Sequence, residues 1–131
     1  MADLTLVAAD VRPLSGAIIR GGYLGEAASV GDLVSPKSDG LFWKSSASAT
    51  PVLPAVGVVV AIGTEGATSG AAGDRVSVQF GGPIAGFTVA SAAKAFTSNN
   101  AGKIADAAGT TSQVVGVGLS DNVLWLEVNL V

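Results

Sequence analysis

The chain contains no cysteine and no histidine. Their absence excludes a disulfide framework, thiol chemistry, the Ser-His-Asp and Cys-His nucleophile systems and the usual zinc sites. Only carboxylates and lysines remain as groups that commonly carry out acid-base chemistry. We therefore expect no catalytic residues, no metal and no cofactor, and we expect that the protein is not an enzyme.

Charged and aromatic residues are also scarce. Charged residues make up 13% of the chain, against about 25% in a typical domain, and aromatic residues make up 5%. The core must therefore consist of Val, Leu, Ile and Ala, which favours thin layers such as a tight barrel or sandwich. The low charge has two interpretations: a surface that meets other subunits, because interface cores are depleted in charge, or an ordinary Gly/Ala-rich domain.

No basic stripe or long apolar run is present. The seven lysines and arginines are scattered singly and the net charge is −3, so we expect no direct binding to nucleic acid. The longest apolar run, residues 54–62, is far shorter than the roughly 20 residues of a membrane helix, so we expect no membrane partner. The N-terminus lacks a basic region followed by an apolar run, and we expect no signal peptide and synthesis in the cytoplasm.

A repeat is visible, with copies at about residues 31–80 and 93–128. Aligning Gly40 with Gly102 pairs residues of similar character: Val34 with Phe96, Ser35 with Thr97, and Phe42 with Ile104. Each copy contains two short strands around a polar turn, then a Val-Gly-Val segment and an alternating closing strand. We predict an all-β fold, a small β-barrel or sandwich built from a duplicated β-unit over residues 16–131. Whether it forms one barrel or two lobes stays open.

The strand pattern also predicts which residues are buried. Val76, Val78 and Phe80 alternate with polar residues at the period of two that is typical of a half-buried strand. The predicted core is lined by Val34, Val58, Val76, Val78, Phe96, Val117, Leu124 and Leu126. Gly57 and Gly116 lie inside apolar runs, where glycine marks a bulge or a close backbone approach. The insertion at residues 63–73 is expected to be a flexible hairpin loop.

Residues 1–15 have no counterpart in the repeat and differ from it in character. They form either an extended N-terminal arm or a first edge strand. The segment has apolar residues that are interrupted by an Arg-Pro pair. Its candidate partner-binding residues are Leu4, Leu6, Val11, Arg12, Pro13 and Leu14.

Two tryptophans complete the candidate partner-binding set. Trp125 shares one face of its predicted strand with Val123 and Glu127, and the aliphatic residues lie on the other face. An outward Trp125 is typical of an interface anchor; the alternative is a barrel that buries both faces. Trp43 follows Phe42, and only one of these two neighbours can face inward on a regular strand.

Asp32 and Asp74 each follow a glycine and open a predicted strand. A pair of carboxylates at a suitable separation can hydrolyse glycosides. The pattern favours the simpler interpretation, in which each aspartate caps a turn. Residues 63–70 are glycine-rich but lack the Lys-Ser/Thr ending of a phosphate-binding P-loop.

The order of these motifs resembles the small capsid decoration, or cement, proteins of tailed bacteriophages. The motifs are Gly-Asp-Leu-Val at 31–34, Asp-Gly at 39–40, a Ser/Ala/Thr-rich stretch, Val-Gly-Val at 56–58, Gly-Asp-Arg-Val-Ser-Val at 73–78, and a closing Val-Gly-Val followed by Leu-Trp-Leu. The resemblance covers about residues 16–131. It implies a homotrimer on the outer surface of the capsid in the virion, which binds the major capsid protein and reinforces its lattice.

Three rival functions stay open. The first is another virion structural module, such as a tail, baseplate or head-fibre component. The second is a surface carbohydrate-binding or adhesin module, which needs a groove with exposed aromatic residues. The third is an enzyme that uses carboxylates alone, which would require a pocket with two or more carboxylates of strongly shifted pKa.

Overall fold

The structure, a computed structural model, describes residues 2–48, 53–64, 66–120 and 122–128. Met1 and residues 129–131, which belong to the predicted arm and domain, lie outside the described residues. The predicted all-β fold class is confirmed. One 3₁₀ turn, η1 (Ala8–Asp10), precedes the strands, which are β1 (Arg12–Pro13), β2 (Ile18–Tyr23), β3 (Ala28–Ser29), β4 (Leu33–Pro36), β5 (Phe42–Lys44), β6 (Gly57–Ile62), β7 (Ser69–Gly70), β8 (Arg75–Ala85), β9 (Lys94–Thr97), β10 (Ile104–Ala105), β11 (Val114–Ser120) and β12 (Val123–Glu127).

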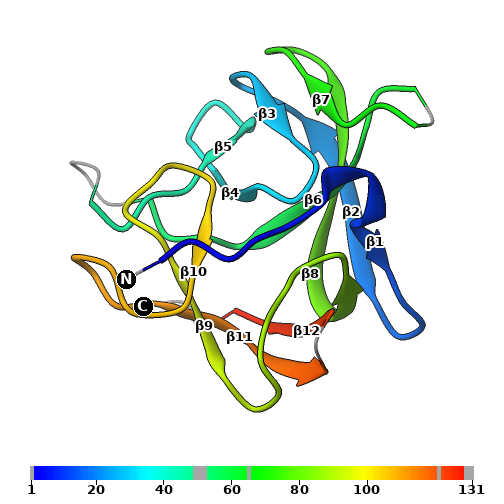
Figure 1. Ribbon diagram of the computed structural model, residues 1–131. Helices are drawn as coiled ribbons and strands as arrows, with labels where there is room; N and C mark the ends of the chain where they lie inside the picture. The colour runs from blue at the N-terminus through cyan, green and yellow to red at the C-terminus, as the bar shows by residue number, and fades with distance from the viewer. Residues whose placement is uncertain (1, 49–52, 65, 121, 129–131) are drawn as a thin grey trace.

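The strands form a curled, antiparallel sheet that wraps around one core (Figure 1). The order across the sheet is β10-β9-β11-β12-β8-β6-β4-β5. The order is symmetric about the β12–β8 pair. On one side β8 pairs with β6, β6 with β4 and β4 with β5; on the other side β12 pairs with β11, β11 with β9 and β9 with β10. The two sequence copies therefore have the same strand connectivity.

Strand β8 joins the two copies. Its first half pairs with β2 and β6, and its second half pairs with β12 and β1. Ser77 in the first copy aligns with Trp125 in the second. Ser77 lies opposite Gly21 of β2, and Trp125 lies opposite Pro83 of β8. The second half of β8 thus occupies in the second copy the place that β2 has in the first. The structural unit begins at β2, earlier than residue 31, where the first copy becomes visible in the sequence.

One hydrophobic cluster draws residues from both copies. Six of the eight predicted core residues are buried: Val34, Val58, Val76, Val78, Leu124 and Leu126. The other two, Phe96 and Val117, are only half-buried. A register shift between Val114 and Gly116 changes the alternation where β11 meets β9. The residues on either side of Phe96, Ala95 and Thr97, are buried instead, as is Val115, two residues before Val117.

The two ends of the curled sheet are joined by hydrogen bonds between the copies. Leu33 N donates to Gly102 O at 2.8 Å, and Gly102 N donates to Ser45 O at 2.8 Å. The buried Gln113 side chain accepts from Ala55 N and donates to Ala55 O, both at 2.9 Å. Thr97 Oγ1 also donates to Gln113 Oε1 at 2.7 Å. Gln113 therefore pairs with Ala55 as a neighbouring strand would.

Gly57 and Gly116 are both sites of close backbone approach. A Cβ at Gly57 would lie 2.5 Å from Gln79 O on β8. A Cβ at Gly116 would lie closer than 3.0 Å to Trp125 O on β12. Neither distance is possible for a real side chain, so both positions require glycine.

The insertion at residues 63–73 does connect β6 with β8, as predicted, but it is more than a flexible loop. It contains β7, which pairs with β3 in a second, two-stranded sheet. Val30 N also donates to Thr68 O at 2.9 Å. The loop therefore packs beside the entrance to β4, where Figure 1 shows β3 and β7 together.

Candidate protein-binding surfaces

The N-terminal segment lies along the curled sheet. Isolated bridges join Asp3 to Ala105 and Leu6 to Phe87, and β1 pairs with the second half of β8 (Figure 1). Residues 2–7 and the 3₁₀ turn η1 lead into the two-residue strand β1. Val11 is buried at 6% exposure, and Leu4 and Leu6 pack against the core. Pro13 and Leu14 are half-buried, so Arg12 is the one candidate of this segment that is exposed.

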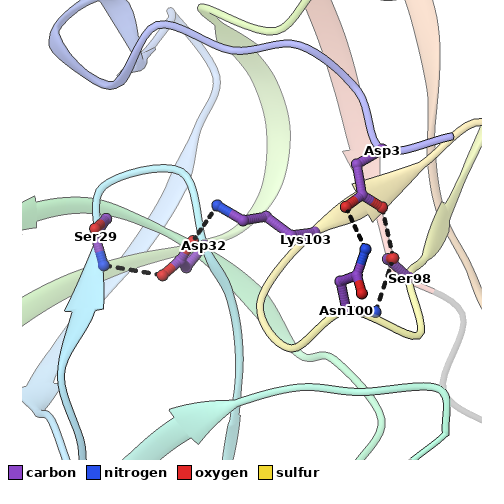
Figure 2. Close-up of polar contacts among 6 residues, drawn as sticks. All are labelled: Asp3, Ser29, Asp32, Ser98, Asn100 and Lys103. Atoms are coloured by element: carbon purple, nitrogen blue, oxygen red, sulfur yellow. Dashed lines mark hydrogen bonds and ion pairs between the residues drawn. The ribbon is translucent and has the colours of Figure 1, made fainter.

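Asp3 fixes the beginning of this segment. Its carboxylate accepts hydrogen bonds from Ser98 Oγ at 2.6 Å and Asn100 Nδ2 at 2.8 Å (Figure 2). Leu4 N donates to Ile104 O at 2.7 Å, and Asp106 N donates to Ala2 O at 2.9 Å. Residues 2–4 thus cover the outer edge of β10.

Trp43 contacts its own hairpin. Lys37 Nζ lies 4.1 Å from the centre of the Trp43 ring, and the indole Nε1 donates to Asp39 Oδ2 at 3.1 Å. Its neighbour Phe42 instead packs against the core, with its ring 6.3 Å from Phe80 in an edge-to-face arrangement. Trp43 is half-buried by these contacts.

Trp125 points outward from β12 and is 39% exposed, whereas the flanking Leu124 and Leu126 are buried. Its cross-strand neighbours are Val117 on β11 and Pro83 on β8. These three residues form an apolar row on the outer face of the sheet, which we call the Trp125 strip. Exposed tryptophan in an apolar surround is typical of a protein interface.

A groove of about 470 Å³ adjoins the Trp125 strip. Val114, Val117 and Val128 supply apolar lining, and Lys94 and Glu127 supply one charge of each sign. The groove therefore combines an apolar floor with two opposite charges. Val117 belongs to both the groove and the strip.

Asp32 and Asp74 cap identical turns. Asp32 Oδ2 accepts from Ser29 N and Asp74 Oδ2 accepts from Ala71 N, each three residues back and each at 2.9 Å. The preceding Gly31 and Gly73 have φ of 98° and 90°, a conformation that favours glycine. The turn-capping interpretation of both aspartates is therefore confirmed.

The two turns differ in their surroundings. Asp32 is buried, and Lys103 Nζ lies 3.6 Å from its Oδ1 (Figure 2). Burial raises the pKa of Asp32, although the Ser29 amide, Lys103 and Lys44 act in the opposite direction. Asp32, Lys44 and Lys103 line a hollow of about 380 Å³ whose described lining contains a single carboxylate. Within the part of the chain that the structure describes, His, Cys, Asp and Glu form no metal-binding group of three or more.

The sequence did not reveal two surfaces that the structure presents. One is the groove between Lys94 and Glu127, which depends on pairing between β9, β11 and β12. The other is the outer edge of β2, where Ile18 is 61% and Tyr23 is 49% exposed. The adjacent isoleucines and the Gly21-Gly22 pair were the available signal for an unusual strand.

The chain matches no protein-family model and no curated protein. Among the residues described, no helix has the length and apolar character needed to cross a membrane.

Proposed function

We propose that this protein is a capsid decoration protein that binds the outside of a tailed-phage head as a homotrimer and stabilises the lattice of the major capsid protein. The ordered Gly-Asp, Asp-Gly and Val-Gly-Val motifs support the proposal by resemblance. The single observation in the structure that supports it best is the Trp125 strip. An apolar row on the outer face of the sheet, with the exposed Trp125 at its centre, suits a protein that works by binding other protein surfaces.

The arrangement of the strip suits a cyclic assembly. A ring forms when one surface of a subunit binds a different surface of the next and the rotation closes. Trp125 provides a projecting side chain, and the neighbouring groove provides an apolar floor with Lys94 and Glu127. In the proposed trimer, Trp125 of one copy enters the groove of the next copy.

The rest of the fold suits a passive structural role. The two copies share β8 and one core, and the seam between them is joined by the Gly102 and Gln113 hydrogen bonds. A body of this kind can connect neighbouring capsid subunits without changing shape. Many copies on one shell act together, because each bound site raises the effective concentration of the others.

The test begins with the mass in solution and continues with co-sedimentation on expanded heads that lack decoration protein. We expect three times the chain mass of 12.8 kDa and saturable binding to heads. Trp125→Ser should shift the mass to that of a monomer and weaken head binding at least tenfold. Val7→Ser, which removes another exposed apolar side chain, is the matched control and should change neither.

A wild-type monomer that does not bind heads would contradict the proposal and would favour a tail component or a small binding module. A trimer that survives Trp125→Ser would show that the strip is not the self-interface. Binding to immobilised polysaccharide but not to heads would support the carbohydrate-binding alternative.

A further inference from the structure

The edge strands of the sheet differ in how far other segments cover them. The edge of β10 is covered by residues 2–4, and the edge of β5 is contacted through the Leu24–Phe42 bridge and the bond from Gly25 N to Phe42 O at 2.8 Å. By contrast, β2 pairs with β8 on one side and with no other strand among the described residues. Proteins usually protect such edges, because an unpaired strand is a template for another chain.

The direction of the β2 backbone groups follows from the neighbouring hydrogen bonds. Leu24 N donates to Asp74 O, and Leu24 O accepts from Gly73 N, so the polar groups of Leu24 point toward β8. Hydrogen-bonded and non-hydrogen-bonded pairs alternate along an antiparallel ladder. The amides of Arg20 and Gly22 therefore also point toward β8, and those of Ile19 and Gly21 point to the uncovered edge. From Tyr23 onward, this side of the chain meets β5 through the Leu24–Phe42 bridge.

The charged residues of β1 and β2 are all basic. All three arginines of the chain lie here: Arg12 on β1, Arg20 on β2, and Arg75 opposite Tyr23 on β8. All three are exposed, and in the described part of the chain the one ion pair is between Lys103 and Asp32. The strands β1 and β2 contain no acidic residue. The two edge strands are thus basic within a chain of net charge −3, and Asp10, Glu26 and Asp74 lie beyond their ends.

A hollow of about 350 Å³ lies beside the same edge. Gly21 leaves space in it, and Tyr23, Arg75 and Ser77 provide polar lining. The Arg75 guanidinium lies 6.0 Å from the centre of the Tyr23 ring. Arginine binds carboxylates through paired, directional hydrogen bonds.

We infer that β2 is a docking edge that receives an extended acidic segment of a partner protein as an added strand. The partner backbone pairs with the outward groups of Ile19 and Gly21, and a carboxylate of the segment enters the hollow beside Arg75. The inference rests on the proposed function, in which the partner is the major capsid protein. It assigns the partner to a surface separate from the Trp125 strip.

Hydrogen exchange measured by mass spectrometry on the full chain tests the docking edge. The probes are expanded heads and, separately, a capped eight-residue peptide of alternating Glu and Val, with a Gln-for-Glu peptide as its control. We expect exchange at Ile19 and Gly21 to slow at least tenfold with heads and with the Glu peptide. The Gln peptide should protect at least tenfold less.

One variant changes the edge strand together with the space beside it, and the other changes only the charge. Gly21→Pro removes an outward amide without removing a bond to β8, and Arg75→Glu reverses the charge beside the hollow. Each should weaken binding to heads at least tenfold while the protein remains trimeric. Lys37→Glu, a charge reversal away from the edge, is the matched control and should bind as the wild type does.

Several results would overturn the inference. If heads bind Gly21→Pro and the wild type equally and do not protect β2, the docking edge is rejected and the proposed function stands. Equal protection by the Glu and Gln peptides would reject the acidic partner. Protection of β2 that rises with protein concentration alone would show that the occupant is a second copy. If the wild type ignores heads but the Glu peptide protects β2, the proposed function fails and the docking edge is supported.

Discussion

The first half of β8 and strand β12 are counterparts in the two copies. Their inner faces carry similar residues, and their outer faces carry different ones. The inner residues are alike in both, being aliphatic and buried: Val76 and Val78 in one strand, Leu124 and Leu126 in the other. The outer residues are unlike: Arg75 and Ser77 in one, Val123 and Trp125 in the other. Burial constrains the inner face because every copy must fill the same core. The outer face is free to differ, and there the two copies acquire separate surfaces.

The largest expected effects are on the inner faces. Leu124→Ala should lower the free energy of unfolding by about 2–5 kcal/mol, since it removes buried methyl groups and leaves a cavity. The counterpart Val76→Ala should also be destabilising, by about 1–3 kcal/mol, because fewer buried groups are removed. Urea unfolding followed by circular dichroism measures both. Ser77→Ala on the outer face is the control, with an expected change within about 0.5 kcal/mol. The symmetry between copies would be broken if only one inner-face variant were destabilising.

The seam between the copies provides the second test. Gln113→Ala leaves Ala55 N and O without their side-chain partner, and a buried unpaired polar group costs about 1–3 kcal/mol. Pro54 is the aligned residue of the first copy and is half-buried. We expect Pro54→Ala to cost clearly less than Gln113→Ala in the same unfolding experiment. Equal losses in the free energy of unfolding would mean that the Gln113 hydrogen bonds add no stability beyond what Pro54 adds in the first copy.

The paired turns at Asp32 and Asp74 give a smaller, pH-dependent effect. The pKa of Asp32 is raised in the folded state by burial, so the folded protein disfavours the ionised form. The resulting loss in the free energy of unfolding is absent below the pKa that Asp32 has in the unfolded chain. It becomes complete as the pH rises through the pKa of Asp32 in the folded protein. Asp32→Asn should therefore improve stability relative to wild type more at pH 7 than at pH 3, in thermal unfolding at both values. Asp74→Asn in the matching turn measures the cost of the substitution itself. A relative stability that falls as the pH rises would contradict the burial argument.

The smallest effect is expected in the turns before β4 and β9. Gly31 has φ of 98° in the first, whereas Ala92 has φ of 65° in the second. A side chain in this left-handed region is strained by about 1–2 kcal/mol, partly offset by the greater chain entropy of glycine when unfolded. Ala92→Gly should therefore stabilise the protein by at most about 1 kcal/mol, and Gly31→Ala should destabilise it. A thermal shift assay compares the two. Destabilisation by Ala92→Gly would show that the Ala92 side chain stabilises its turn.

Short-range patterns were sufficient to predict much of the molecule. The alternation at residues 75–80 and 123–128 identified the buried faces of two strands, because side chains on a strand alternate between its faces. The Gly-Asp pairs predicted two turns, since each aspartate bonds to an amide only three residues away. The outward direction of Trp125 followed from the same alternation. These features depend on neighbours in the chain, which is why one sequence suffices.

The sequence by itself determined the β class, the duplicated unit, the turns and the inward residues of the regular strands. Only the tertiary structure decided that β8 belongs to both copies, that Phe96 lies outside the core, and that β2 has an uncovered edge. A register shift at Val114 and the pairing of residue 81 with both Ile18 and Glu127 arise between segments far apart in the chain. Long-range pairing leaves no local signal, because the same alternating strand can pair with many partners until the whole sheet selects one.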